Sequence, residues 1–415
     1  MKTINNLHEA ELALEPFWPT NLQDKRTIYS TEHMERFMEF IHDPQNMPKA
    51  IHIAGTSGKT STAYYVASLL KQAGKKVGLM TSPHIEALTE RVQIDLSPLP
   101  EREFCSELTV FLGLVEQSGI ALSYAEILYG FAFWEFARHR VDYIVVEVGM
   151  GGLLDATNVM DREDKISVIT DIGLDHTIAL GGSLEEITRH KAGIIHLHNA
   201  VFMHRQSDAV VEVVCEASKR RQADLRILEQ VKAPDFLSRF QKRNFSLARD
   251  VVAHALQCDN SAMLTETQIA EAAKVHIPGR MELFRRRRKL VILDNAHNPQ
   301  KLQMLRETID EQYPKKSIAI LLAFVASNGR NFEEMVEAIT PIAEHVITTA
   351  VPAGMHLRKS CDPEEIADIA RQYGVAVETI DHAEQAYQAL LERPEDILVV
   401  TGSTYLLEHI RPLVR

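Results

Sequence analysis

The sequence predicts an α/β protein with two domains. Short apolar, β-branched runs alternate along the chain with longer helical patterns, which is typical of βαβ units around a parallel sheet. A length of 415 residues suits two domains. The segment Ile277-Pro-Gly-Arg280 separates two such series, and Pro and Gly break regular structure. We therefore expect one domain at residues 1–278 and a smaller one at residues 279–415.

The first series of elements predicts the sheet of the N-terminal domain. Its expected strands are Ala50–Ala54, Val77–Met80, Tyr143–Val148, Ile166–Thr170 and Ala200–Met203. Helical patterns lie between them at Thr60–Ala73, Glu101–Gln117, Ala125–Arg138 and Leu184–Ala192. Ligands of such sheets bind beyond the carboxyl ends of the strands, so the polar residues that follow these strands are the candidate site residues.

The second series predicts the C-terminal domain. Its expected strands are Leu290–Asp294, Ser317–Leu322, His345–Thr349, Val375–Thr379 and Asp396–Thr401. Just before them stands a dense basic run, Arg285-Arg-Arg-Arg-Lys289, which follows an apolar stretch at Met281–Phe284. Since one expected strand precedes this run and another follows it, we interpret the run as an exposed hairpin turn.

Composition excludes several classes of protein. Lys and Arg number 45 against 57 Asp and Glu, a formal net charge of −12, so a broad nucleic-acid-binding face is not expected. No apolar run approaches the ~20 residues that span a bilayer, and the polar N-terminus lacks a signal peptide's apolar region. The four cysteines are scattered, without a CxxC pair, as in reduced proteins. We expect a cytoplasmic protein with no nucleic-acid or membrane partner.

The strongest local signal is a phosphate-binding loop. An apolar strand runs into a glycine-flanked turn and then into an amphipathic helix, through Gly55-Thr56-Ser57-Gly58-Lys59-Thr60-Ser61. The glycines let the backbone curl around an anion, and the helix N-terminus and Lys59 add positive charge. Thr60 or Ser61 can offer a hydroxyl to Mg²⁺. The alternative is a glycine-bearing strand–helix turn with an exposed lysine.

Two residues at later strand ends are candidate metal ligands. Glu147 ends an otherwise apolar strand, and burying a carboxylate is costly unless a cation or hydrogen bonds compensate it. His176 follows the strand Ile166–Thr170, so it is expected at the same sheet edge. The alternatives are a salt-bridged Glu at a strand end and a surface loop His.

The segments around these two residues add further candidates. Glycines 149, 151 and 152 allow a ligand to approach the backbone, and the polar loop that follows carries Asp155 and Asn158. Ser183-Leu-Glu-Glu186 is a capping box that begins a helix, and Lys191 lies near its end. By itself, Lys191 could be a solvated cation that the helix dipole favours.

Taken together, these residues resemble the Mur ligase superfamily and, within it, the folylpolyglutamate synthase/dihydrofolate synthase family. The resemblance covers roughly residues 30–415, and its motifs follow the family's order. They are Gly55-Thr-Ser-Gly-Lys-Thr60, Thr81-Ser-Pro-His84 with Glu90-Arg-Val92, Glu147-Val-Gly-Met-Gly-Gly152, Leu154-Asp-Ala-Thr-Asn158, Ile172-Gly-Leu-Asp-His176, Lys191-Ala-Gly-Ile-Ile195, Gln241 with Asn244, Pro278-Gly-Arg280, Asp294-Asn-Ala-His-Asn-Pro299 and Thr401-Gly-Ser-Thr-Tyr405.

The resemblance implies a two-domain Mur-ligase-like fold, with an N-terminal P-loop ATPase sheet and a Rossmann-like C-terminal domain. It also implies roles for the nucleotide-site residues. Lys59 would hold the ATP phosphates with the loop from Gly55 to Ser61. Gln241 and Asn244 match a motif near the nucleotide, Arg280 would contact phosphate, and Asp294 the ribose.

The metal and substrate residues follow from the same resemblance. Thr60 or Ser61, Glu147 and His176 would bind magnesium, as two ions, and Lys191 falls where the family carries a carbamylated lysine. Lys59, Lys191 and His176 are the expected catalytic residues. The candidate substrate contacts are His84, Arg91, Asp155, Asn158 and His297.

The implied activity is an ATP-dependent carboxylate–amine ligase that works through an acyl phosphate. Our leading hypothesis is that it adds L-glutamate to a folate or dihydropteroate. The alternatives are a Mur-type ligase for another carboxylate, such as a cell-wall precursor, and a nucleotide-binding regulator without turnover. We expect small-molecule substrates and a monomer. A second interpretation of the basic run Arg285–Lys289 is that it binds an anionic polyglutamate tail.

Overall fold

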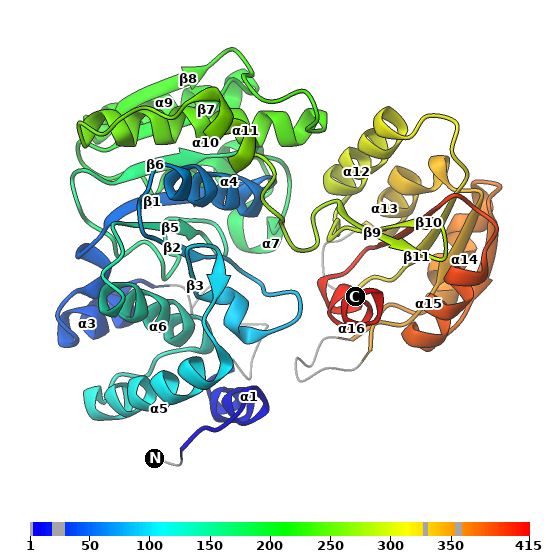
Figure 1. Cartoon of the computed structure of the whole chain (residues 1–415), viewed down its shortest axis with the longest axis horizontal. Helices are drawn as coiled ribbons and strands as arrows, with labels where there is room; N and C mark the ends of the chain where they lie inside the picture. Colours follow the sequence, from blue (N-terminus) through cyan, green and yellow to red (C-terminus); the bar gives the residue numbers. More distant parts are fainter. Residues whose placement is uncertain (1–2, 19–29, 327–330, 353–358) are drawn as a thin grey trace. The chain divides into compact units, whose positions relative to one another are not determined.

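The computed structural model describes residues 3–18, 30–326, 331–352 and 359–415 (Figure 1). The chain forms two compact units. The first ends at Val275 and the second begins at His276, except that residues 238–240 belong with the second unit. No helix in the described part of the chain is both long enough and apolar enough to cross a membrane.

The first unit is built on an eight-stranded sheet with strand order β4-β3-β2-β5-β1-β6-β7-β8. Strands β2, β5, β1, β6, β7 and β8 are parallel to one another, whereas the short β3 is antiparallel to both of its neighbours, β2 and β4. The bounds are β1 Lys49–Ala54, β2 Val77–Met80, β3 Gln93–Ile94, β4 Ser97–Pro98, β5 Tyr143–Glu147, β6 Ile166–Ile169, β7 Ala200–His204 and β8 Asp224–Leu228. The predicted parallel sheet is confirmed, and β5 and β1 lie at its centre.

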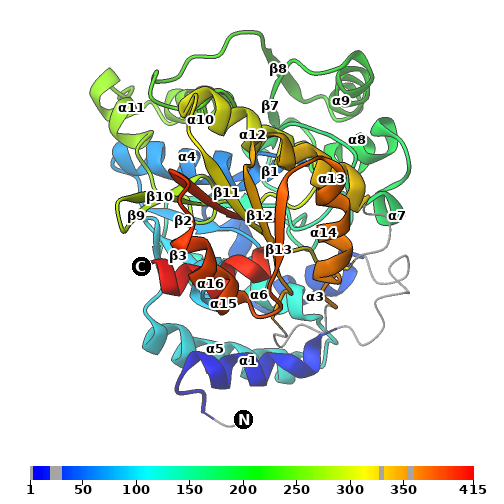
Figure 2. The same ribbon diagram turned by 90° about the vertical axis from the view of Figure 1, so that its right-hand side faces the viewer.

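Helices cover this sheet on both faces (Figures 1 and 2). The helices are α1 Leu7–Leu14, α3 Glu32–Phe40, α4 Lys59–Gln72, α5 Glu101–Ser118, α6 Tyr124–Arg138, α7 Thr177–Leu180, α8 Leu184–Ala192, α9 Asp208–Arg220, α10 Arg239–Cys258 and α11 Glu266–Ala272. Short 3₁₀ turns occur at Glu15–Phe17, Pro44–Asn46 and Leu88–Arg91. The rings of Tyr65 and Phe245 meet edge to face at 5.1 Å and join α4 to α10.

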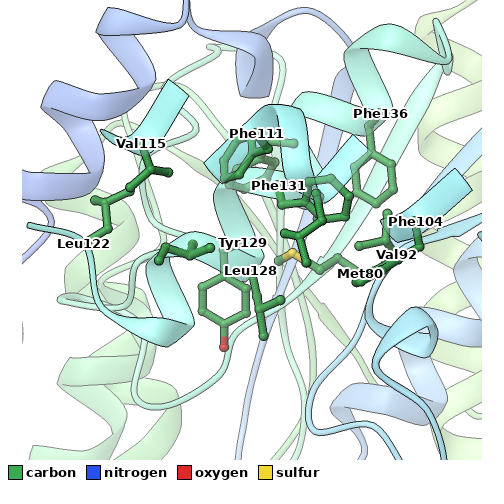
Figure 3. Close-up of a cluster of buried hydrophobic side chains, with 14 of the residues drawn as sticks. Met80, Val92, Phe104, Phe111, Val115, Leu122, Leu128, Tyr129, Phe131 and Phe136 are labelled. Atoms are coloured by element: carbon green, nitrogen blue, oxygen red, sulfur yellow. The ribbon is translucent and has the colours of Figure 1, made fainter. Parts of the chain in front are cut away.

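Helices α5 and α6 pack together through aromatic residues (Figure 3). The ring of Phe131 meets those of Phe104 and Phe111 edge to face, at 5.1 and 5.5 Å, and all three side chains are fully buried. Ser123 begins α6 with a capping box that includes Glu126. This cluster fixes the two helices on the β2–β5 part of the sheet.

The second unit contains a six-stranded sheet with order β13-β12-β11-β14-β10-β9, in which only β9 is antiparallel to its neighbour among the described residues. Its strands are β9 Glu282–Arg286, β10 Lys289–Leu293, β11 Ile318–Leu322, β12 His345–Thr348, β13 Ala376–Thr379 and β14 Ile397–Thr401. Its helices are α12 Pro299–Gln312, α13 Phe332–Ile339, α14 Pro363–Gln372, α15 Ala383–Glu392 and α16 Thr404–Val414, with a 3₁₀ turn at Thr340–Ile342. Strands β9 and β10 form the hairpin predicted for the basic run, with Arg287 and Arg288 at its left-handed turn.

Candidate active site

The loop between β1 and α4 lies against the neighbouring strand end. Gly58 has φ of 88°, a left-handed conformation that favours glycine, and a methyl group there would collide with the side-chain oxygen of Asn244. The backbone N–H groups of Thr56 and Ser57 donate to the carbonyl oxygen of Asp171, at 2.9 and 3.0 Å. These two N–H groups are therefore directed at the chain after β6 rather than at an anion held by the loop. The N-terminus of α4 is the part of the loop that remains suited to phosphate.

Two lysines converge on one carbonyl oxygen of this loop. Lys59 Nζ donates to the Gly55 carbonyl at 3.1 Å, and Lys191 Nζ donates to the same oxygen at 2.8 Å. Lys191 lies in the last turn of α8, which begins at the predicted capping box of Ser183, and it is only 4% exposed. Its interpretation as a solvated helix-end cation is wrong, because the end of α8 packs inward.

Glu147 lies at the carboxyl end of β5 and is 2% exposed. The hydroxyl of Thr60 donates to its Oε1 at 2.9 Å, and the backbone N–H of Ser82 donates to its Oε2 at 3.3 Å. Ser61 is buried one position further along α4. Of the two hydroxyl candidates, Thr60 is thus the one that the structure pairs with the carboxylate. A carboxylate and a hydroxyl at a phosphate loop are ligands that Mg²⁺ accepts.

His176 lies between β6 and α7, where it is the N-cap residue in a left-handed conformation (φ 52°). Its side chain is 49% exposed, and its Nε2 lies 3.9 Å from the carboxylate of Asp175. The structure confirms its place just beyond β6, whereas its role as a metal ligand stays a prediction.

Helix α10 carries two buried amides, and that of Asn244 lies beside the loop. Gln241 and Asn244 are 7% and 5% exposed, and the Asn244 oxygen lies against Gly58. Within the described part of the chain, Gln241 Oε1 and Asn244 Nδ2 have no hydrogen-bond partner. Since a buried polar atom without a partner is costly, a ligand at the loop would compensate both.

Asp155 and Asn158, in the loop after β5, are held by hydrogen bonds to backbone groups. The backbone N–H groups of Met150 and Thr157 donate to Asp155, at 2.8 and 3.0 Å, and burial raises the pKa of this carboxyl. The Asn158 amide donates to the carbonyls of Leu153 and Gly193 at 3.2 and 3.1 Å. Substrate contact by these side chains stays a prediction, and their hydrogen bonds support a loop-holding role.

His84 and Arg91 are brought together on the connection between β2 and β3. Arg91 Nε donates to His84 Nδ1 at 2.9 Å, and the guanidinium lies 5.8 Å from the centre of the Tyr124 ring. The sequence placed both residues among the substrate contacts, and the structure adds their direct hydrogen bond.

In the second unit, Arg280 and Asp294 lie near each other at the β9–β10 pair. The backbone N–H of Met281 donates to Asp294 at 2.8 Å. Burial raises the pKa of Asp294 to about 6, although the positive charge of Arg280 opposes this shift. A buried carboxylate beside a guanidinium is able to accept from a ligand hydroxyl.

His297 lies at the start of α12 and makes a contact that the sequence analysis missed. Its Nδ1 donates to the Asn295 carbonyl at 2.8 Å, and its Nε2 accepts from Lys301 Nζ at 3.1 Å. The four-residue spacing of His297 and Lys301 across the start of a helix was the available signal. Asn295 was also missed. Its Oδ1 accepts from Thr404 at 2.8 Å, and its buried Nδ2 has no hydrogen-bond partner in residues 3–18, 30–326, 331–352 and 359–415.

Comparison with models of known protein families identifies the family of the chain. Residues 53–282, more than half of the chain, match the model of the Mur ligase middle domain. Residues 279–404 match the model described as Mur ligase, glutamate ligase domain. The chain belongs to the Mur ligase family. The predicted family and two-domain fold are confirmed.

Individual relatives indicate which members of this family the chain is similar to. The chain is 30% identical over 417 residues to a probable bifunctional folylpolyglutamate synthase/dihydropteroate synthase of Haloferax volcanii, covering 92% of this chain and 48% of that protein. It therefore spans about half the length of that relative. It is 27% identical over 413 residues to the dihydrofolate synthase/folylpolyglutamate synthase of Bacillus subtilis, covering 91% of this chain and 93% of that protein.

A solved structure agrees with these relatives. The folylpolyglutamate synthase of Mycobacterium tuberculosis, complexed with ADP and AMPPCP, superposes with a TM-score of 0.84 at 26% identity, covering 98% of each chain. The resemblance to folylpolyglutamate and dihydrofolate synthases that the motifs indicated is thus confirmed over nearly the whole chain.

Proposed function

We propose that this chain is an ATP-dependent carboxylate–amine ligase that adds L-glutamate to a folate or to dihydropteroate. The observation that carries the chemistry is the pairing of Thr60, the second residue of α4, with the buried carboxylate of Glu147. This pair supports a magnesium site beside Lys59, the first residue of the same helix. The names of the relatives supply the substrate class.

ATP and magnesium fit the residues present. The N-terminus of α4 and Lys59 would hold the phosphates, and the orphaned amides of Gln241 and Asn244 support a ligand at the same loop. Thr60, Glu147 and His176 would hold two Mg²⁺ ions, which supply charge neutralisation of the transferring phosphoryl group. The motif resemblance implies phosphate contact for Arg280 and ribose contact for Asp294.

The reaction requires activation because an amine cannot displace oxide from a carboxylate. The acceptor carboxylate attacks the γ-phosphorus of ATP and releases ADP, which gives an acyl phosphate. The free amine of glutamate then attacks the acyl carbon, loses a proton, and expels phosphate as the amide forms. Lys59 offsets charge on the phosphoryl group, and positioning of amine and acyl phosphate supplies the remaining rate.

Lys191 is proposed to be carbamylated. Two ammonium groups that donate to one carbonyl oxygen repel each other in a buried site. Reaction of the neutral Lys191 amine with CO₂ forms a carbamate and releases a proton. Because the product is an anion, it would attract Lys59 and offer oxygen ligands to magnesium.

The test is ATP turnover against a matrix of acceptors and amino acids. Dihydropteroate, tetrahydrofolate and cell-wall nucleotide precursors are each combined with L-glutamate or another amino acid, and products are identified by mass. Lys59→Ala should abolish turnover, while Lys71→Ala, in the last turn of the same helix, serves as the matched control.

Glutamate-dependent turnover with a pterin acceptor is the expected result, and the acceptor used shows which step the enzyme serves. Turnover with a cell-wall precursor alone would replace the folate proposal by the Mur-type alternative. ATP binding without turnover on any acceptor would contradict the ligase proposal and favour the regulatory alternative.

A further inference from the structure

A cluster of potential metal ligands lies outside the proposed active site, at the N-terminal end of α5 and the C-terminal end of α6. Glu103, Glu135 and His139 each offer one ligand atom, and these atoms all lie within 4.8 Å of one another. His139 Nε2 is 3.0 Å from Glu103 Oε1 and 3.4 Å from Glu135 Oε2. Glu135 lies in the last turn of α6 and His139, four residues later, is the C-cap residue of that helix, while Glu103 comes from the first turn of α5.

Glu135 provides a second, independent indication of a ligand. Its side chain is 1% exposed, and neither carboxylate oxygen has a hydrogen-bond partner among the residues that the structure describes. Its nearest cations are Arg138, whose Nε lies 3.6 Å away, and His139. A carboxylate buried without hydrogen bonds is expensive, so an ion that coordinates it would remove a real cost.

The charge balance around Glu135 also favours a cation. Glu103 and Glu107 face the same region, and Arg138 pairs with Glu107 at 3.0 Å. Three carboxylates thus share one guanidinium and one imidazole. Burial, together with the charges of Glu107 and Glu103, raises the pKa of Glu135 to about 8 against the opposing effect of Arg138.

The ligand types and spacing select the class of metal. One imidazole and two carboxylates suit Zn²⁺ better than Mg²⁺, which prefers oxygen ligands in an octahedron. Ligand bonds of about 2.1 Å in a tetrahedron put neighbouring ligand atoms roughly 3.4 Å apart. The two distances from His139 Nε2 lie near this value.

We propose that Glu103, Glu135 and His139 bind a structural Zn²⁺ ion that ties α5 to α6. The backbone of His139 is already fixed, because its N–H donates to the Glu135 carbonyl at 2.8 Å and its C=O accepts from Lys76 Nζ at 2.6 Å. The ion would add a second link between the two helices, besides the contact of Phe104 with Phe131. This site is separate from the residues proposed for ATP and magnesium, so it does not depend on the proposed function.

Zinc binding is measured on the full chain in saturating Mg²⁺, which occupies magnesium sites. Protein stripped of metal is titrated with Zn²⁺, separated from free ion, and analysed for zinc content. The unfolding midpoint is followed by tryptophan fluorescence. The variants are H139Q and E135Q, with H33Q as a matched control because His33 is exposed on α3.

One zinc per chain and a raised unfolding midpoint are expected for the wild type and for H33Q. H139Q and E135Q should lose that equivalent, with affinity weakened at least about tenfold. The zinc-dependent rise of the unfolding midpoint should be lost in both variants. Absence of stoichiometric zinc in the wild type, or equal zinc in all four proteins, would overturn the proposal.

Discussion

Gly58→Ala tests the geometry of the phosphate loop. Gly58 has φ of 88°, and the left-handed conformation costs a residue with a Cβ roughly 1–2 kcal/mol. The added methyl group would also collide with the Asn244 oxygen, and overpacking typically costs about 1–3 kcal/mol. The total expected loss of unfolding free energy is roughly 2–5 kcal/mol. Nucleotide affinity should fall as well, because the N-terminus of α4 must move.

Gly74→Ala is the matched control for this prediction. Gly74 also has a positive φ, of 77°, but a methyl group there meets no described atom within 4 Å. Its expected cost is the conformational part alone, roughly 1–2 kcal/mol. Adding Asn244→Ala to Gly58→Ala should remove the collision and restore stability toward the Gly74→Ala value.

Urea unfolding followed by tryptophan fluorescence measures these losses in the first unit alone. Both tryptophans of the chain, Trp18 and Trp134, belong to that unit. Binding of a fluorescent ADP analogue measures nucleotide affinity. Equal destabilisation by Gly58→Ala and Gly74→Ala, or no recovery in the double variant, would refute the described packing of Asn244 on the loop.

Three further predictions concern individual side chains. Lys191→Ala should abolish turnover, and small carboxylic acids should restore part of it; unchanged ATP-dependent turnover would contradict the carbamate. The pKa of Asp294 rises to about 6 on folding, so between about pH 4 and 6 the folded state binds a proton that the unfolded state has lost. The free energy of unfolding of the second unit should therefore fall as pH rises from about 4 to 7, by up to roughly 3 kcal/mol. Asp294→Asn should flatten this pH dependence in circular dichroism melts. An unchanged dependence of stability on pH would show that Asp294 is not its source. Glu282→Gln should cost roughly 3–5 kcal/mol, measured in the same melts, because it removes the charge of a carboxylate that pairs with the buried guanidinium of Arg411. A loss below about 1 kcal/mol would contradict a buried ion pair between these two side chains.

Much of the fold could be predicted because most strands are continuous apolar runs. Apart from β9, every strand expected from the sequence agrees with the structure to within one residue at either end. The strands that were missed had weaker signals. Strands β3 and β4 contain two residues each, and β8 mixes polar and apolar residues without burying any fully.

The site was predictable where a motif is local and less so where packing decides. The phosphate loop, Glu147 and the capping box before Lys191 can be identified from neighbouring residues. The burial of Lys191 could not, since a cation in the last turn of a helix looks the same in sequence whether that end faces solvent or Gly55. The hydrogen bonds from Thr56 and Ser57 to Asp171 likewise join segments that only the sheet brings together.

Transfer of ¹⁸O from the acceptor carboxylate to phosphate tests the central claim most directly. The pterin acceptor is labelled in both carboxylate oxygens and incubated with Mg-ATP and L-glutamate, and the released phosphate is analysed by mass. A ligase that works through an acyl phosphate must place one ¹⁸O in each phosphate that accompanies an amide product. Unlabelled phosphate, or release of AMP and pyrophosphate, would contradict the account.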